Sequence, residues 1–328
     1  MRAWPLIKLL PEKTRFRYVR YARVLGALSL LACLASLFLT LVPLKPPCGG
    51  LNCGVDFRGG TVLELSTAPR DVDTAGVRST LTGLGLGDVQ VQSLDGPQEA
   101  LVRFESPEGQ NAAQVVGRAK AALEQRLGEV RFSRTEVVGP KVSGELFQAG
   151  LLALITAIAL MLVYIWFRFG LTFGIGAVVA LFHDVILTFG LFAVTDLEFT
   201  LTGVAAILTV IGYSMNDTVV VLDRVRENLR KFKRMPLGEL IDLSVNETLS
   251  RTIITGITGI MALTGLAVFG GEALLGFSVA MIFGIIVGTY SSIFVAAPVL
   301  LMLGVRRGED EVVVKAGGPA AKPATPRP

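Results

Sequence analysis

The sequence predicts a polytopic α-helical membrane protein that carries one small α+β domain. Of its 328 residues, 52% are hydrophobic and only 18% are charged, a balance that ordinary soluble domains do not have. Several uncharged runs are also long enough to cross about 30 Å of hydrocarbon. A lipid bilayer is therefore the expected solvent for most of the chain.

Six apolar runs are predicted to be transmembrane helices. The first continues well past Cys33 without a convincing small-residue cleavage site, so we interpret it as an uncleaved span rather than a signal peptide. The runs cover residues 24–44, 146–167, 170–194, 198–222, 252–270 and 274–304.

Lysine and arginine are distributed unevenly between these runs. Seven precede residue 24, six lie between 223 and 250, and five follow residue 304, whereas the connections 195–198 and 270–273 have none. The positive-inside rule then places both termini and the 223–250 loop in the cytoplasm. The predicted domains are a basic N-terminus, the first span, an extracytoplasmic domain, a five-helix region and a disordered, proline-rich tail: 1–23, 24–44, 45–144, 145–304 and 305–328.

The extracytoplasmic segment is predicted to fold as βαββαβ, the ferredoxin-like order. It contains no histidine and no cysteine beside a base, and its fold alone names no function. Strands are expected at 59–67, 88–94, 99–105 and 129–138, and helices at 71–84 and 108–128.

Between the fourth and fifth spans, the segment 236–252 has an amphipathic pattern. Leu237, Leu240, Ile241 and Val245 recur at helical spacing. We expect this helix to lie at the cytoplasmic surface of the membrane.

Cys48 and Cys53 flank a four-residue tract on the predicted outer side of the membrane. A disulfide is permissible there, and two free thiols are the alternative. A metal site would need more ligands. We expect no metal, no other cofactor and no enzymatic chemistry, because no Walker loop, nucleophile with its base, or metal cluster occurs.

Asp217 and Arg251 are ionisable residues within or at the edge of predicted spans. Such residues are costly at membrane depth and often mark a pathway for ions or protons. Removal from water favours the neutral form of a carboxyl group, and a nearby guanidinium favours its ionised form. A carboxylate balanced between these two effects could take up and release protons. A static ion pair, or two side chains that reach the cytoplasmic surface, is the alternative.

Polar residues accompany these two charges. Thr202, Thr209, Tyr213 and Asn216 share one side of the fourth span with Asp217, and that side is expected to face other helices. The fifth span offers Thr255 and Thr258 at helical spacing from Arg251. Together they predict a polar network around Asp217.

His183 and Asp184 occupy the middle of the third predicted span. Neighbouring residues on a helix point about 100° apart, so the two are not expected to form an obvious hydrogen-bonded pair. Each could bond a neighbouring helix as structural support or relay protons. We favour support for His183 and leave both roles open for Asp184.

Glycines predict close helix packing in three spans. Gly170 with Gly174, and Gly284 with Gly288, have the GxxxG spacing. Gly256, Gly259 and Gly265 thin the fifth span.

Four motifs in this order resemble the SecF family of bacterial protein-export membrane subunits. They are VDFRGGTVLEL (55–65), HDV (183–185), IGYSMNDTVVVLDRVREN (211–228) and NETLSRTIIT (246–255). The resemblance covers residues 16–304 and implies a six-helix unit of the resistance-nodulation-division type.

The resemblance implies a function in the bacterial inner membrane. The unit would work with SecD at the SecYEG translocon, after or beside the ATP-driven SecA step, and use the proton gradient to draw a polypeptide outward. Asp217 then matches the family's proton-carrying aspartate, and Arg251 its functional arginine. No role with nucleic acid is expected.

Two other functions are compatible with the residues. One is a self-contained proton-coupled exporter of a small molecule or lipid, although no internal repeat supplies a second six-helix half. The other is a passive assembly factor of the translocon, which would leave the cost of burying Asp217 without a function.

Overall fold

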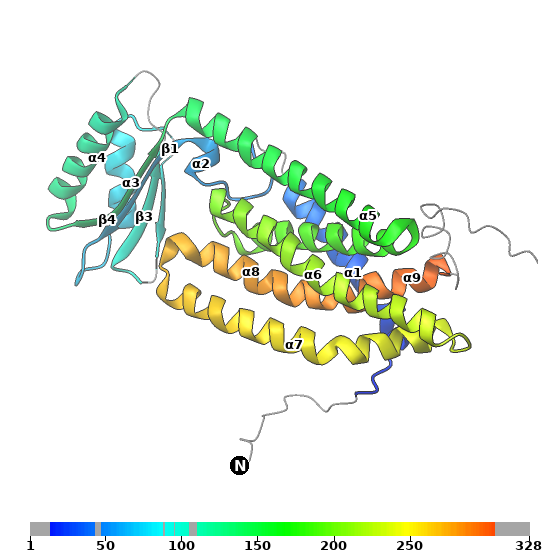
Figure 1. The fold of residues 1–328 in the computed structure, drawn as a ribbon. Helices are drawn as coiled ribbons and strands as arrows, with labels where there is room; N and C mark the ends of the chain where they lie inside the picture. The colour runs from blue at the N-terminus through cyan, green and yellow to red at the C-terminus, as the bar shows by residue number, and fades with distance from the viewer. Residues whose placement is uncertain (1–13, 43–46, 88, 95, 105–109, 306–328) are drawn as a thin grey trace, which may run out of the picture.

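The structure is a computed structural model that describes residues 14–42, 47–87, 89–94, 96–104 and 110–305, with backbone only at 272 and 273. The predicted disordered tail lies outside the described residues except for Val305. Within them, a small sheet domain adjoins one end of a long helix bundle (Figure 1). The predicted class of an apolar helical protein with a small α+β domain is confirmed.

All four predicted strands of the sheet domain are present. The antiparallel sheet has the order β2-β3-β1-β4, and α3 and α4 cover one of its faces (Figure 1). The elements are β1 Gly60–Ser66, α3 Thr74–Gly83, β2 Gln90–Ser93, β3 Glu99–Phe104, α4 Ala112–Leu127 and β4 Arg131–Val138.

Alternation along β1 builds a core on each face of the sheet, because successive side chains point to opposite sides. Leu63 and Leu65 are fully buried and pack in the core that α3 and α4 complete. Val62 between them faces the other side, where it packs with Val55 of the short helix α2 Val55–Arg58.

Five helices among the described residues are long and apolar enough to cross a membrane. They are α1 Tyr18–Leu41, α5 Pro140–Thr195, α6 Leu201–Lys231, α7 Leu237–Phe269 and the continuous run of α8 Glu272–Ser291, η1 Ser292–Ala296 and α9 Ala297–Leu303.

Helix α5 contains two of the predicted spans because the chain reverses at Gly170. This residue has φ 70° and ψ −169°, a conformation that only glycine adopts readily. A Cβ built on Gly174 would lie 3.4 Å from Ile165, so residues before and after the reversal are in contact. The predicted close helix approach is therefore found at Gly174, which packs against Ile165, and is wrong for Gly170, which forms the turn.

Helices α6 and α7 form an antiparallel hairpin that is longer than predicted. The expected surface helix at 236–252 is the first half of α7, and Leu240, Ile241 and Val245 are buried in a core shared with Val225 and Leu229 of α6. Placement of that apolar face on the membrane surface is wrong, because α6 covers it.

The start of α1 is fixed by side chains from α7. Asp242 accepts the backbone N–H of Val19 at 2.9 Å, and Asn246 accepts that of Phe16 at 3.0 Å. Asn246 also donates to the Phe16 carbonyl at 2.9 Å. These contacts satisfy backbone groups at the helix start that have no partner within α1.

Helix α8 packs closely on α6 through Gly284 and Gly288. A Cβ built on Gly284 would lie 2.2 Å from a methyl carbon of Val210, and one on Gly288 would lie 2.9 Å from Ser214 Cβ. The predicted close helix approach is confirmed for this glycine pair.

Gly284→Ala is expected to destabilise the purified protein by about 1–3 kcal/mol, because the added methyl group overlaps Val210. The matched control is Gly265→Ala, since a Cβ at Gly265 meets no atom within 4 Å. Chemical unfolding in detergent measures both changes. Equal stability of the two variants would contradict the packing described for α8.

Asp73 is expected to make α3 sensitive to acid. Its carboxylate caps α3 by accepting the Gly76 N–H at 2.8 Å, and this bond lowers the pKa of Asp73 below its usual value. The stabilisation is thus complete above the unfolded pKa of about 3.9 and is lost as pH falls through the lower folded pKa.

Hydrogen exchange of the α3 amides, corrected for intrinsic rates, measures this loss in wild type and Asp73→Asn. The variant keeps a capping oxygen but should show a smaller pH dependence. Helix α4 is an internal control, because its cap, Asn111, does not titrate. The same acid response in both proteins would rule out Asp73 as its source.

Candidate functional site

Asp217 lies on α6 with only 8% of its surface exposed. Thr252 of α7 donates a hydrogen bond to Oδ1 at 2.5 Å, and Ser292 at the start of η1 donates to Oδ2 at 2.9 Å. Three elements therefore converge on this carboxylate. Neither hydroxyl partner was identified from the sequence.

Asp184 lies on the part of α5 that follows the reversal at Gly170, and 1% of its surface is exposed. Its Oδ2 accepts hydrogen bonds from Ser214 of α6 and from Ser291 of α8, the latter at 2.7 Å. His183 Nδ1 lies 2.8 Å from Asp184 Oδ1. The expectation that these neighbours would not form an obvious pair is wrong, because each side chain is turned about its Cα–Cβ bond toward the other.

Two consecutive serines donate hydrogen bonds to the two different carboxylates. Ser291 ends α8 and bonds Asp184, while Ser292 begins the π-helical turn η1 and bonds Asp217. Adjacent helix positions diverge by about 100°, so one segment can reach a carboxylate on either side. The sequence feature that could have revealed these two hydrogen bonds is a Ser-Ser pair inside an apolar span.

A small recess beside Asp217 brings the predicted polar network together. Arg251 lines it, but no ion pair joins Arg251 to Asp217 among the described residues. The other lining residues include three predicted members: Tyr213, Asn216 and Thr255, together with Val220, Thr252 and Thr289.

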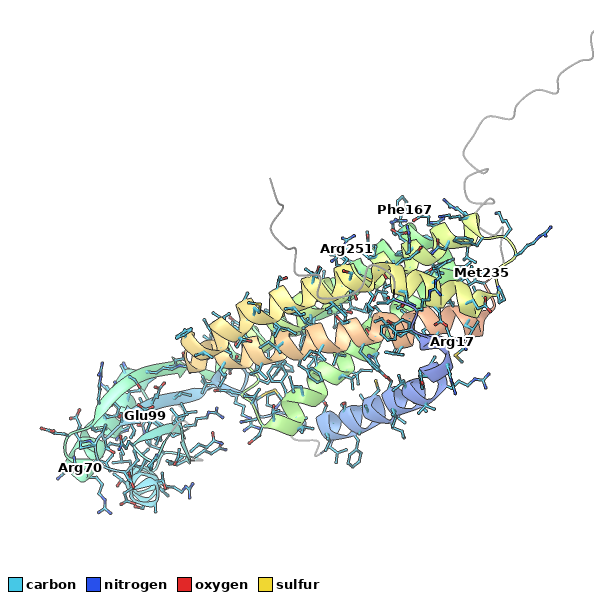
Figure 2. The ribbon with its side chains drawn as sticks, turned by 90° about the horizontal axis from the view of Figure 1, so that it is seen from below. Arg17, Arg70, Glu99, Phe167, Met235 and Arg251 are labelled. Atoms are coloured by element: carbon cyan, nitrogen blue, oxygen red, sulfur yellow. A yellow bond between two sulfur atoms is a disulfide. The ribbon has the colours of Figure 1, made fainter. Side chains whose placement is uncertain are left out.

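The side of the network that was expected to face other helices is partly open. Asn216, Arg251, Thr255 and Thr258 are exposed in this chain. Figure 2 labels Arg251 along the bundle, between the sheet domain and Met235 at the opposite end. Within this chain, Thr252 contacts the carboxylate, whereas Thr255 and Thr258 do not donate to it.

His183 connects the buried carboxylate region to α1. Its ring stacks on Tyr290 with 6.1 Å between centroids, and the Tyr290 hydroxyl lies 2.7 Å from Ser29 Oγ. His183 Nε2 has no hydrogen-bond partner among the described residues. The histidine thus both supports packing and carries an unused polar atom.

At the other end of α6, the sheet domain is joined directly to the bundle. Asp56 Oδ2 accepts the N–H of Leu201, the first residue of α6, at 2.9 Å. Arg103 of β3 forms a 2.8 Å ion pair with Glu198 in the connection before α6. The helix that carries Asp217 is therefore held at its start by residues of the sheet domain and α2.

Cys48 and Cys53 form a disulfide, with their Cα atoms 6.2 Å apart. Cys53 also forms a backbone bridge with Phe199 next to Glu198. The disulfide thus restrains residues 48–53, which precede α2 and the sheet domain. Within the described ranges, no group of three or more His, Cys, Asp or Glu side chains is arranged to hold a metal ion.

Comparison with known families agrees with this arrangement. The family model described as "Protein export membrane protein SecD/SecF, C-terminal" matches residues 118–306, more than half of the chain. A second, "SecD/SecF GG Motif", matches residues 50–69. The chain belongs to the SecD/SecF family.

Curated SecF relatives match this chain over nearly its full length. The "Protein translocase subunit SecF" of Cereibacter sphaeroides is 44% identical, over 95% of this chain and 96% of the relative. That of Rickettsia felis is 42% identical, over 95% and 99%. The chain is thus a SecF protein translocase subunit and a multi-pass membrane protein.

A solved structure of SecDF has the same fold. The crystal structure from Thermus thermophilus, described as a translocon-associated membrane protein, aligns with a TM-score of 0.80 and 31% identity. The alignment covers 91% of this chain and 40% of that chain. A second form, described as super-membrane-facing, aligns with a TM-score of 0.64 and 32% identity over 94% and 41%.

The serine pair yields a test of the SecF bundle. Ser291→Ala and Ser292→Ala each remove one donor from a buried carboxylate and should each cost about 1–3 kcal/mol of stability. Ser278→Ala is the matched control, because Ser278 is also buried on α8 but its hydroxyl has no partner among the described residues. Thermal unfolding in detergent should separate the pair from the control, and three equal shifts would refute the assigned role.

Proposed function

We propose that this SecF subunit, with SecD, uses proton flow through its membrane region to drive or complete polypeptide export at the SecYEG translocon. SecA would act indirectly, through the same translocon. The supporting observation is a buried carboxylate, Asp217, that accepts hydrogen bonds from two neutral hydroxyls and lies in a recess lined by Arg251. Asp184 would provide a second proton-binding group, and His183 would support it.

Hydroxyl partners suit a carboxylate that changes its charge. Thr252 and Ser292 donate to ionised Asp217, and each hydroxyl can also accept a hydrogen bond when the carboxyl is protonated. Neither state leaves a buried polar group without a partner. Asp217 can therefore gain and lose a proton without disrupting the bundle around it.

Protonation would change the attraction between Asp217 and Arg251 and so shift the preference between two helix packings. One elementary charge that crosses about 100 mV supplies about 2.3 kcal/mol. Reversing a two-state population almost completely needs about 5.5 kcal/mol. Several protons per cycle, or an added pH gradient, would be required.

We propose six membrane crossings, with α5 providing the second and third. The reversal at Gly170 and the basic residues at 223–250 support cytoplasmic termini in a bacterial inner membrane and an outer sheet domain. The domain limits at residues 24, 45, 145 and 305 remain our proposal. The βαββαβ order and the sheet order β2-β3-β1-β4 support a ferredoxin-like assignment for the outer domain.

Family membership favours polypeptide export over the small-molecule exporter considered from the sequence. We infer that SecD covers the open side of the recess, where Asn216, Arg251 and Thr255 are exposed in this chain. A purely passive role would leave two buried carboxylates as a cost without a function.

Asp217→Asn is expected to abolish the gradient-dependent part of export, because an amide cannot exchange a proton yet still bonds Thr252 and Ser292. The measurement is completion of a partly translocated client in inverted vesicles that contain SecD and SecYEG, with and without a proton gradient. Export without a gradient should be unchanged.

The amount of assembled complex in each vesicle preparation controls for loss of protein. Wild-type export by an assembled Asp217→Asn complex would show that Asp217 has a structural role. The proposed proton mechanism would then be wrong for this residue.

Glu198→Gln should uncouple the outer domain from α6 by breaking the ion pair with Arg103. Because both side chains of this pair are partly exposed, the variant should lower the stability of the protein by about 1–3 kcal/mol. The same vesicle assay should lose gradient-dependent export although Asp217 is intact. Glu136→Gln is the matched control, because its pair with Arg134 lies within the single strand β4. Equal export by both variants would exclude this joint from force transmission.

A further inference from the structure

A second polar site lies at the end of the bundle away from the sheet domain. It is a surface pocket of about 480 Å³ between the end of α6 and Arg168, which precedes the Gly170 reversal of α5. None of the residues around Asp217 or Asp184 lines it. The α6 residues that line it recur at helical spacing and share one side of the helix: Asp223, Arg226, Glu227, Arg230 and Lys231.

The pocket carries an excess of positive charge. Its six lining residues include four cationic and two anionic side chains. Asp223 already forms an ion pair with Arg168, and Glu227 forms one with Arg224 at 2.6 Å. Since both carboxylates have a guanidinium partner, the lining as a whole favours an added anion.

Large exposed apolar side chains lie within three residues of Arg168 on α5. Trp166 is 64% exposed, Phe167 is 90% exposed and Leu171, just after the reversal, is 74% exposed. Figure 2 labels Phe167 and Met235 toward the bundle end that lies away from the sheet domain. A lipid with its phosphate in the pocket would meet these exposed apolar side chains of α5 with its acyl chains.

We propose that this pocket binds the phosphate of an anionic phospholipid in the leaflet at that end of the bundle, with its acyl chains along the exposed side of α5. Juxtamembrane arginine and lysine clusters attract such headgroups, and guanidinium groups can bond phosphate in a bidentate manner. The proposal rests on the proposed membrane orientation but not on proton coupling.

Trp166 supplies the probe for a direct test. The sequence contains two tryptophans, so Trp4→Phe leaves Trp166 as the only fluorophore of this kind, two residues from Arg168. Its quenching is measured in bilayers with brominated phosphatidylglycerol or brominated phosphatidylcholine. We expect the anionic lipid to associate near Trp166 more strongly, on the order of fivefold.

The decisive variant is Arg226→Gln with Arg230→Gln and Lys231→Gln, which should reduce this preference to about one. Lys231→Gln alone should give a partial loss and serves as a milder change. The matched control removes three exposed cations near the start of α1, as Arg15→Gln, Arg20→Gln and Arg23→Gln, and should retain the preference.

Three results would overturn the proposal. They are equal quenching by both lipids in the Trp4→Phe protein, the same loss of preference in the α1 control, and abolition of the preference by soluble glycerol phosphate. The second result would indicate general surface attraction, and the third a site for free phosphate. No result of this assay depends on export, so its failure would leave the proposed proton mechanism intact.

Discussion

Two carboxylates inside an apolar helix bundle constrain the packing around them, because a carboxylate removed from water needs polar partners within the protein. Ser214 on α6 and Ser291 on α8 bond Asp184, while Thr252 on α7 and Ser292 on η1 bond Asp217. These hydrogen bonds fix the relative rotation of five helical elements: α5, α6, α7, α8 and η1.

Small residues make that arrangement sterically possible. The approach of α8 to α6 at Gly284 and Gly288 places Ser291 and Ser292 against the faces that carry Ser214 and Asp217. A bulkier contact at Gly288 would separate Ser214 from α8, which would also lengthen the distance from Asp184 to Ser291. Glycine packing and carboxylate solvation are thus parts of one constraint.

Helix α6 is bonded to neighbouring elements at both of its ends. At one end, Asp56 and the Arg103–Glu198 pair join the helix to α2 and the sheet domain. At the other, Asn228 donates to Ser244 and Glu247 of α7 at 3.0 and 2.8 Å, which extends the hairpin beyond the apolar spans. A movement of α6 near Asp217 would therefore also displace the elements bonded to its two ends.

The amino-acid sequence by itself determined the apolar helices, the strands and the positions of the buried charges, because hydropathy and side-chain alternation are local properties. It also indicated five of the eight residues that line the recess: Tyr213, Asn216, Asp217, Arg251 and Thr255. It placed the amphipathic face of 236–252 on the membrane and the Gly170 turn within a helix contact, since the pattern does not specify which surface covers an apolar face. Only the tertiary structure decided that Ser291 and Ser292 serve different carboxylates, because hydroxyl partners from separate helices are selected by the packing angle and not by sequence spacing.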